Sequence, residues 1–499
     1  MMRTSITTII FLTALAISLA ANASATSLLD AKLVGDEVVK TSFADIKIEH
    51  NHISDESSQV LFDQMDLQRA SQAYMWSTPI VSLMTWREEQ AKSLGVEGRG
   101  QWFVANSLKE KRGIVTANLT TPYILNFDVI DDGKPLVVEF PAGQTAGMVL
   151  DMWQRPVVDF GLTGPDQGQG GTYVIVGPND DPAKYQKEGV YVAQSATNGI
   201  FMGTRFITDY KTTAARFEKE MKIYAYGEKA AQTKFHTDID VEWSATAPRG
   251  MLYWERLHRV MNESPVRDQD KAWMAMLKPL GLEIGKPFKP TKRQQEILVK
   301  GGNLGELMLR NMQTNPRFTE PYWPNTAWYK CFDFDTPQIT DTRVELDERA
   351  IWFYEAVTSS KGMVYPTPGK GQVYMTTKRD SDGNLLRADQ TYKLHVPANV
   401  PVKQFWSLTL YSQDTRRPYD NGGTTVRDGS LGNRTEGLQY NADGSIDLYI
   451  GNKAPKGKES NFIKTVGEDG WFVYFRLYAP TEPFFDKSFQ LGDFEKISQ

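Results

Sequence analysis

The best metal-like pattern in the chain is His236, Asp238 and Asp240, which alternate along the sequence. Side chains two positions apart point to the same face of a β-strand, where imidazole and carboxylate groups could bind a metal ion. The same alternation is typical of the solvated face of a strand. His50 and His52 supply two further imidazoles but no third ligand. We therefore expect a solvated strand edge, no bound metal and no other cofactor.

Acid–base or nucleophilic chemistry has weaker support. The sequence has no Gly-x-Ser-x-Gly element, so the commonest serine-hydrolase geometry is unsupported. Gly281–Lys286 resembles a phosphate loop, but it is one residue short and is followed by Pro287. Asp151, Glu355 or Asp382 could act as an acid or base only in a cleft that raises its pKa. Whether the protein is an enzyme stays open.

Aromatic side chains are concentrated in the segment Tyr322–Tyr329, which holds two Trp and two Tyr. Their flat apolar faces and polar tips could stack on a sugar ring or grip an apolar ligand. Packing between domains would use the same faces. Both hypotheses stay open at this point.

Two β-rich runs near the C-terminus predict different roles for Trp406 and Arg476. Alternation places Trp406, Leu408 and Leu410 on one face of a strand, so Trp406 should be core. Arg476 shares a face with Tyr474 and other aromatic residues. That face suits a ligand cavity or a wet sheet surface, and a guanidinium there can donate to a carboxylate or phosphate.

The N-terminus is typical of an export signal: Arg3 precedes an apolar run, and small residues alternate up to Ala25. We expect cleavage after Ala23 or Ala25 and a soluble periplasmic or extracellular protein. No later stretch has the ~18 consecutive apolar residues of a membrane span. We therefore expect no transmembrane segment after cleavage.

The charge argues against nucleic acid as a partner, and the cysteine content excludes an intramolecular disulfide. The chain has 56 basic and 61 acidic residues, a net charge of −5, and no basic stripe. Nucleic acid is therefore not an expected partner. Cys331 is the only cysteine, so no intramolecular disulfide can form. We expect its thiol to be buried and inert.

The texture of the sequence predicts a multi-domain protein, mainly β with α. After the signal (1–25) we expect a segment with a long helix (26–97), an N-terminal β-sandwich (98–230), a helical bridge (231–360) and a C-terminal jelly-roll-like β-sandwich (361–499). The long helix should cover 57–94 with a kink at Pro79. The bridge should hold helices at 268–277, 291–312 and 346–359, the second interrupted at Gly301 and Gly302.

The β regions also resemble two paired bacterial families, the domains of unknown function 1254 and 1214. The first resemblance is carried by Thr116–Tyr123, Leu136–Pro141 and Gly171–Pro178. The second is carried by five spaced motifs: Asp380–Gly383, Phe405–Tyr411, Asn441–Ser445, Ser460–Phe462 and Phe475–Pro480. The resemblance implies two β-sandwiches joined by a helical middle, and it implies no activity.

Two functional hypotheses follow. In the first, a cleft between the sandwiches binds or processes a small molecule, a sugar or a lipid-like ligand, because ligand sites favour domain interfaces. In the second, the protein is a noncatalytic structural or assembly module of the cell envelope. Exposed sandwich edges favour a homo-oligomer in either case. The candidate cleft residues are Asn118, Thr120, Tyr123, Trp153, Arg205, Tyr322, Trp328, Tyr411 and Arg476.

Overall fold

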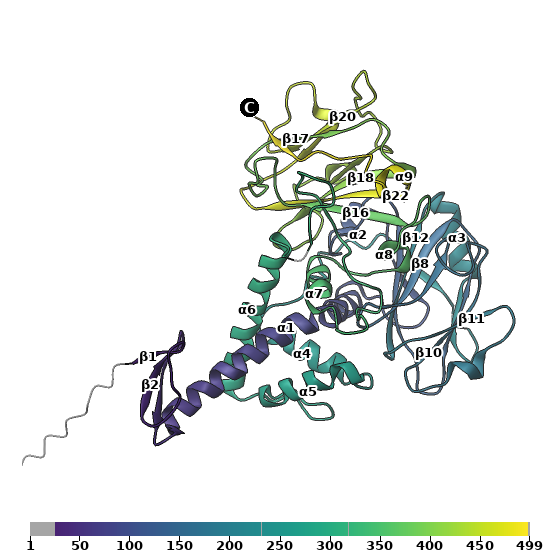
Figure 1. Ribbon diagram of the computed structural model, residues 1–499. Helices are drawn as coiled ribbons and strands as arrows, with labels where there is room; N and C mark the ends of the chain where they lie inside the picture. Colours follow the sequence, from purple (N-terminus) through teal and green to yellow (C-terminus); the bar gives the residue numbers. More distant parts are fainter. Residues whose placement is uncertain (1–24, 231, 318, 498–499) are drawn as a thin grey trace, which may run out of the picture. The chain divides into compact units, whose positions relative to one another are not determined.

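The computed structural model describes residues 25–230, 232–317 and 319–497 (Figure 1). Apart from Ala25, the expected export signal lies outside these residues. The chain divides into two compact units, Met1–Leu67 and Gln68–Gln499. In the part of the chain that is described, no helix combines the length and the apolar character needed to cross a bilayer.

The first unit contains a small sheet with the strand order β1-β2-β3-β4. Its strands are β1 (Thr26–Ser27), β2 (Glu37–Lys40), β3 (Asp45–Glu49) and β4 (His52–Ile53). In β3 the exposed and buried residues alternate, which puts Ile46 and Ile48 on the core side with Val39. The first turns of helix α1 (Asp55–Leu94) complete the unit.

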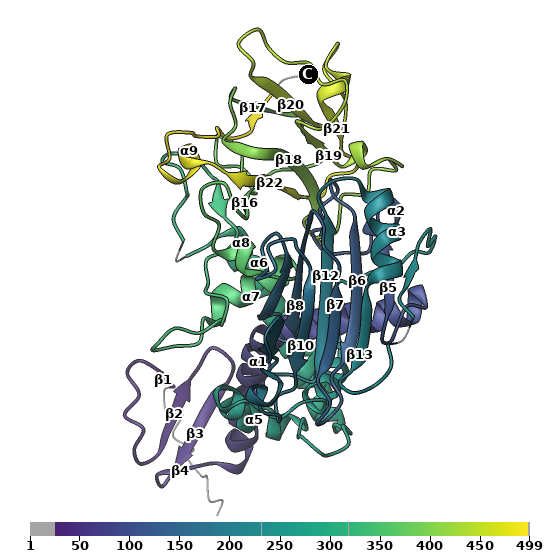
Figure 2. The ribbon, with the colours of Figure 1, turned by 90° about the vertical axis from the view of Figure 1, so that its right-hand side faces the viewer.

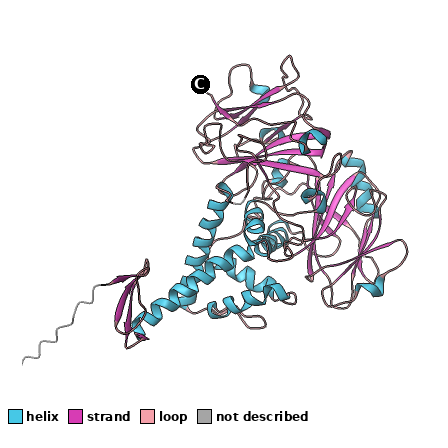
Figure 3. Ribbon diagram, in the orientation of Figure 1, coloured by secondary structure: helices cyan, strands magenta, loops and turns pink. Residues whose placement is uncertain are grey.

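Helix α1 confirms the predicted long helix and passes into the second unit. It starts with Asp55 and Glu56, whose charges suit the positive end of the helix dipole. It continues past Pro79, and residues 73–86 are buried on every side. A helix that is buried all round is a core helix. Other helices surround it (Figure 3): α4 (Met251–Met261), α5 (Lys271–Leu277), α6 (Lys292–Thr314) and α7 (Leu346–Glu355).

The predicted interruption of α6 at Gly301 and Gly302 is wrong, because the helix is continuous from its N-cap, Thr291, to Thr314. The glycines instead allow a close approach to α1. A methyl group on Gly301 would lie 2.3 Å from Cβ of Ala70, whereas one on Gly302 would lie 3.5 Å from the indole nitrogen of Trp254. The contact between the helices therefore needs glycine at position 301 and tolerates alanine at position 302.

This contrast predicts opposite effects for neighbouring substitutions. Gly302→Ala should raise the free energy of unfolding by up to ~1 kcal/mol, because alanine is the better helix former. Gly301→Ala should lower it by ~1–3 kcal/mol, because the added methyl overpacks the contact with α1. Urea denaturation of the two variants measures the difference. Equal effects would mean that the helices are not in contact at Gly301.

The N-terminal β-sandwich consists of two sheets, whose strands run roughly vertically in Figure 2. Their strand orders are β11-β10-β7-β13 and β14-β5-β6-β12-β8-β9. The bounds are β5 (Gln101–Ala105), β6 (Tyr123–Val129), β7 (Leu136–Phe140), β8 (Thr145–Asp151), β9 (Pro156–Gly161), β10 (Gly171–Val176), β11 (Val190–Gln194), β12 (Gly199–Phe206), β13 (Lys222–Ala225) and β14 (Lys234–His236). Most neighbouring pairs are antiparallel, but β10–β11 and β5–β14 are parallel.

Both faces of the six-stranded sheet are buried. One face, with Trp102 and Ile124, packs on the four-stranded sheet and on helix α3 (Tyr210–Glu220). The opposite face, with Leu125 and Phe201, belongs to the core that includes α1. This second face is the one that reaches the candidate site.

The C-terminal β-sandwich also has two sheets, β15-β16-β22-β18-β19 and β21-β20-β17-β23. The bounds are β15 (Tyr329–Lys330), β16 (Gln372–Thr377), β17 (Tyr392–Val396), β18 (Val402–Ser412), β19 (Ser430–Gly432), β20 (Ile446–Gly451), β21 (Phe462–Lys464), β22 (Trp471–Pro480) and β23 (Glu495–Lys496). Trp406, Leu408 and Leu410 point into the core between these sheets, as predicted.

The outer face of the five-stranded sheet is buried as well. Every residue of β22 is buried, including Tyr474 and Arg476. Tyr474 packs with Trp352 of α7 and with Tyr374 of β16. The prediction of a wet sheet surface around Arg476 is therefore wrong, which leaves the ligand-cavity alternative. The protein is thus mainly β with α and multi-domain, as expected.

Candidate functional site

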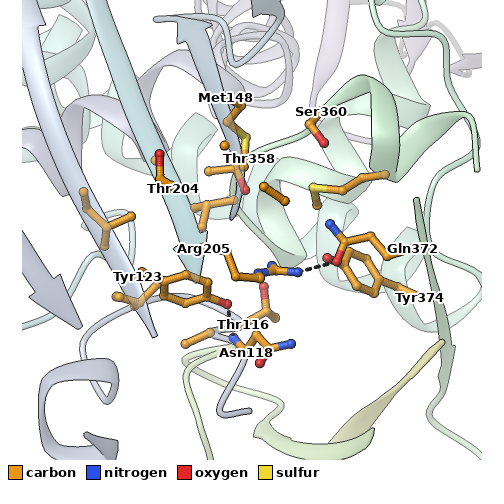
Figure 4. A pocket seen from close by; sticks show the side chains of 18 of the residues that line it. Thr116, Asn118, Tyr123, Met148, Thr204, Arg205, Thr358, Ser360, Gln372 and Tyr374 are labelled. Atoms are coloured by element: carbon orange, nitrogen blue, oxygen red, sulfur yellow. Dashed lines mark hydrogen bonds between the residues drawn. The ribbon is translucent and has the colours of Figure 1, made fainter. Parts of the chain in front are cut away.

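A cavity lies where the outer face of the C-terminal five-stranded sheet meets the N-terminal six-stranded sheet (Figure 4). It leaves about 80 Å³ for the centres of water-sized molecules, which is enough for roughly six waters. Strands β6, β8 and β12 supply one wall, and β16 and β22 supply the other. Residues 114–118 and the chain that follows α7 close the sides.

Arg205, near the end of β12, is the first of two buried cations in the cavity wall and is 9% exposed. Its guanidinium donates a hydrogen bond to Oε1 of Gln372 from the opposite wall (Figure 4). It also lies 5.4 Å from the ring centroid of Tyr123 and 5.5 Å from that of Tyr478. Among the described residues, Nε of Arg205 has no hydrogen-bond acceptor.

Arg476, on β22, is the second buried cation and is 2% exposed. Its Nη2 donates to the carbonyl oxygen of Thr116 at 3.0 Å. Its Nε and Nη1 have no acceptor among the residues that the structure describes. The rings of Tyr374 and Tyr474 each lie 5.0 Å from the guanidinium. Burial alone would lower the pKa of Arg476, but the phenol groups around it, Tyr411 foremost, raise that pKa above its usual value.

The charge of these two cations is not balanced by carboxylates in the cavity wall. No Asp or Glu is among the described residues that line it. With 61 acids in 499 residues, an average wall would hold about one acid in every eight residues. Glu355 lies behind the wall, where it accepts a hydrogen bond from the Tyr474 hydroxyl at 2.5 Å and pairs with Lys378 at 2.6 Å. The cavity itself is therefore cationic.

The rest of the cavity wall is largely apolar and aromatic. Trp86 of α1 lies 5.1 Å from Phe201 of β12, measured between ring centroids. Leu125, Met148 and other apolar side chains continue this surface. A buried anion can thus contact two guanidiniums while an apolar or flat body rests on the aromatic surface. The other apolar lining residues include Ile114, Val115, Trp352, Val357 and Met363.

Lys111, in helix α2 (Leu108–Lys111), is a third buried cation, behind Tyr123. Its Nζ donates to the carbonyl oxygen of Thr121 at 2.9 Å and lies 5.3 Å from the Tyr123 ring centroid. Burial lowers the pKa of Lys111 from 10.5 to about 7, and the charge of Arg205 adds to this effect. The pKa of Lys111 is therefore sensitive to any anion that binds near Arg205.

This lowered pKa predicts how stability depends on pH. Below pH 7 both the folded and the unfolded chain carry the Lys111 charge, and the folded chain bears the full cost of burying it. Between pH 7 and 10.5 only the unfolded chain stays protonated, so the Lys111 contribution to stability rises with pH. Lys111→Met should therefore stabilise the protein most below pH 7, with a gain that shrinks toward pH 10. Urea denaturation across this range tests the trend, and a gain that grows with pH would contradict it.

Four of the nine predicted cleft residues line the cavity: Asn118, Tyr123, Arg205 and Arg476. The backbone N–H of Asn118 donates to the Tyr123 hydroxyl at 3.0 Å (Figure 4), and its side-chain amide donates to the Tyr478 hydroxyl. Hydrogen bonds from both sandwiches therefore hold Asn118 in place.

Two further predicted residues lie just behind the wall. The hydroxyl of Tyr411 donates to the carbonyl oxygen of Ala117 at 2.7 Å, and its ring lies 5.6 Å from the Arg476 guanidinium. The N–H of Thr120 donates to Oδ1 of Asn118 at 2.6 Å. Both residues support the loop that carries Asn118.

The other three predicted residues lie elsewhere. Trp328 is fully buried in the C-terminal core, where its indole donates to the carbonyl oxygen of Gly492 at 2.9 Å. Tyr322 stacks on Phe484 beside that core. Trp153 packs in the helical core against Trp76. For the Tyr322–Tyr329 segment, core packing accounts for the aromatic residues.

None of the three proposed carboxylates lines the cavity. Asp151 pairs with Arg155 at 2.7 Å, Asp382 is exposed in a turn, and Glu355 lies behind Tyr474. Burial raises the pKa of the Cys331 thiol, which agrees with the expected inert thiol.

The predicted His236, Asp238 and Asp240 alignment does not form. Strand β14 ends at His236, and Asp238 adopts a left-handed backbone conformation with φ = 57°. His236 hydrogen-bonds to Gln101 at 2.8 Å, while Asp240 pairs with Lys109. Within the described parts of the chain, no group of three His, Cys, Asp or Glu side chains could hold a metal ion.

Sequence reasoning missed several wall residues, among them Gln372, Tyr374 and Trp86. Gln372 and Tyr374 share a face of β16, and Tyr374 pairs with Arg476 across β16 and β22. The alternation in this strand could have placed both near Arg476 once the pairing was known. No local pattern in the sequence could have identified Trp86, because the sequence of α1 does not show which face of the helix lines the cavity.

The fold and the cavity define a two-sandwich β-protein with a central helical layer. Two family models match it in the expected order: residues 102–225 match a protein of unknown function, DUF1254, and residues 371–482 match a protein of unknown function, DUF1214. These matches confirm the resemblance stated from the sequence motifs. A search of the curated proteins gave no match.

Two solved structures are similar to this chain. The VPA0106 protein from Vibrio parahaemolyticus is 17% identical with a TM-score of 0.53, and the alignment covers 87% of this chain and 100% of that one. An uncharacterized protein from Burkholderia cenocepacia is 10% identical with a TM-score of 0.39, and the alignment covers 88% and 98% of the two chains. The first likeness supports the shared fold alone.

Proposed function

We propose that this protein binds a small organic anion in the cavity between its two β-sandwiches, clamped by Arg205 and Arg476. The observation that carries the proposal is the pair of buried guanidiniums, one from each sandwich, in a wall without carboxylates. Both have N–H groups without acceptors among the described residues. A bound anion would supply those acceptors.

The energetics favour this role. A buried ion without a partner costs several kcal/mol even after relaxation, and most buried charges are therefore paired. Contacts with aromatic rings offset part of this cost for Arg205 and Arg476. The N–H groups that lack an acceptor among the described residues are Nε of Arg205 and Nε and Nη1 of Arg476, and a carboxylate or phosphate oxygen is the acceptor that a guanidinium N–H binds most strongly.

The cavity wall favours binding over catalysis. It holds no His, Cys, Asp or Glu among the described residues, so the side chains that most often act as general acids and bases, or that activate a hydroxyl nucleophile, do not line it. The aromatic surface around Trp86 and Phe201 favours an organic anion over an inorganic one, because only an organic body would use it.

Isothermal titration calorimetry with matched ligands tests the proposal. Benzoate should bind, whereas neutral benzamide, which has nearly the same shape, should bind at least tenfold more weakly. Arg205→Gln should lower the affinity for benzoate. Arg343→Gln is the control, because Arg343 is exposed, pairs with Glu348 and does not line the described walls of the cavity. If no organic anion binds, or if Arg205→Gln binds as well as the wild type, the proposed function is wrong.

We further propose that the protein acts outside the cytoplasm. The support is the sequence alone: a short apolar run followed by small residues up to Ala25. The mature chain should then begin near Ser24 or Thr26. Mass spectrometry of the N-terminal peptide from the envelope fraction measures this, and an intact Met1 in the exported protein would refute it.

A further inference from the structure

A second, larger cavity adjoins the first one and leads away from it. It leaves about 630 Å³ for the centres of water-sized molecules. The two cavities share four wall residues: Ala146, Thr163, Arg205 and Gln372. We call the larger cavity the vestibule and the smaller one the inner cavity. The hydrogen bond from Arg205 to Gln372 lies at their boundary.

The vestibule wall carries several side chains that can form hydrogen bonds. Three amide side chains line it, those of Gln167, Gln372 and Gln404, and hydroxyl groups lie between them. Amides donate and accept hydrogen bonds, so they suit hydroxylated ligands. The hydroxyl-bearing wall residues are Thr163, Tyr365, Thr367 and Tyr478.

The vestibule, like the inner cavity, is lined by basic residues and by no acidic ones among the described residues. Lys361 and Lys370 line it together with Arg205, and no Asp or Glu occurs in the described part of its wall. An elongated anion would therefore meet no repulsive carboxylate along either cavity.

The two walls together limit the class of ligand. The inner cavity has room for one sugar-sized ring, an aromatic surface at Trp86 and Phe201, and a buried amide at Asn118. A long acyl chain would not fit in the inner cavity, and in the vestibule it would lie against amide, hydroxyl and lysine side chains. A ligand that fills both cavities therefore needs hydroxyl groups along its length and an acid group at its inner end.

We propose that the ligand is an acidic saccharide, whose uronate unit occupies the inner cavity and whose neighbouring sugar units lie in the vestibule. This proposal rests on the proposed function, because the uronate carboxylate is the anion held by Arg205 and Arg476. The vestibule amides contribute the affinity that a longer saccharide gains over a single uronate.

Calorimetry with a uronate series tests this assignment. The probes are galacturonate, its unbranched dimer and tetramer, the matching neutral galactose oligomers, and decanoate as a lipid-like acid. The tetramer should bind at least tenfold more tightly than the monomer, and the neutral tetramer and decanoate should bind at least tenfold more weakly than the acidic tetramer.

Variants separate the vestibule from the inner cavity. In Gln167→Ala/Gln404→Ala the ratio of tetramer to monomer affinity should fall below about three. Gln295→Ala is the control, because this exposed amide on α6 only donates to Pro290, and it should keep the wild-type ratio. Circular dichroism should show that both variants are folded.

The outcomes distinguish the two proposals. If benzoate binds in an Arg205-dependent way but uronate oligomers gain nothing over the monomer, the saccharide assignment is overturned and the anion-binding function stands. Tighter binding of decanoate than of the tetramer would overturn it in favour of a lipid-like acid. If neither benzoate nor any uronate binds, both proposals fail.

Discussion

Arg476→Met should lower the affinity for a small organic anion ~30-fold or more, while the melting temperature of the ligand-free protein stays the same or changes little. Loss of a buried charged hydrogen-bond partner costs ~2–5 kcal/mol of binding free energy, and each ~1.4 kcal/mol is tenfold in affinity. Stability should behave differently, because Arg476 is buried without a carboxylate partner. Replacing such an ion by an apolar side chain of similar length is often neutral or stabilising.

Titration calorimetry and thermal melts of the same samples measure both effects. The substitution leaves the carbonyl oxygen of Thr116 without this donor, which costs ~1–3 kcal/mol and offsets the gain from removing the buried charge. Arg343→Met is the control at a surface ion pair. A large fall in the melting temperature with unchanged affinity would make Arg476 a structural residue and would remove the main support for the anion site.

Trp406→Ala should lower the free energy of unfolding by ~3–5 kcal/mol, because it removes a large side chain from a packed core and leaves a cavity. Trp406 is 4% exposed, and its ring stacks on Phe475 with the centroids 5.3 Å apart. Urea denaturation monitored by circular dichroism gives the value. Trp406→Phe keeps most of the contact and should lose less than half as much. A loss below about 1 kcal/mol would show that the side chain is not part of the core.

Much of the C-terminal sandwich could be predicted because period-two alternation is a strong local signal. In β18 it separated Trp406 from Tyr411 correctly, and in β22 it separated Phe475 from Arg476. The sequence could not show that both faces of this sheet are covered. That depends on Trp352 and other residues of distant segments, which have no local pattern in common with β22.

The candidate site was predicted only in part for the same reason. Asn118 and Arg205 were among the predicted cleft residues, and both line the cavity. Trp328 could equally have stacked on a ligand, but its side chain is buried in the C-terminal core. An aromatic side chain looks the same in sequence whether it packs inside a domain or lines a cavity, so only tertiary structure separates the two.

Helix α6 continues through Gly301 and Gly302, although an interruption was predicted there. Glycine in a helical pattern predicted an interruption, since glycine weakens isolated helices. Here the close contact with Ala70 outweighs that weakness. A helix-propensity scale describes an isolated helix, whereas α6 is stabilised by its packing against α1.

The two arginines of the proposed clamp come from different sandwiches of the second unit, Arg205 from β12 and Arg476 from β22. During synthesis the N-terminal sandwich is complete long before β22 leaves the ribosome. A chain that ends before Trp471 lacks β22 and, with it, one side of the clamp. A column that carries an immobilised ligand would therefore retain full-length chains, whereas chains that ended before β22 would pass through it.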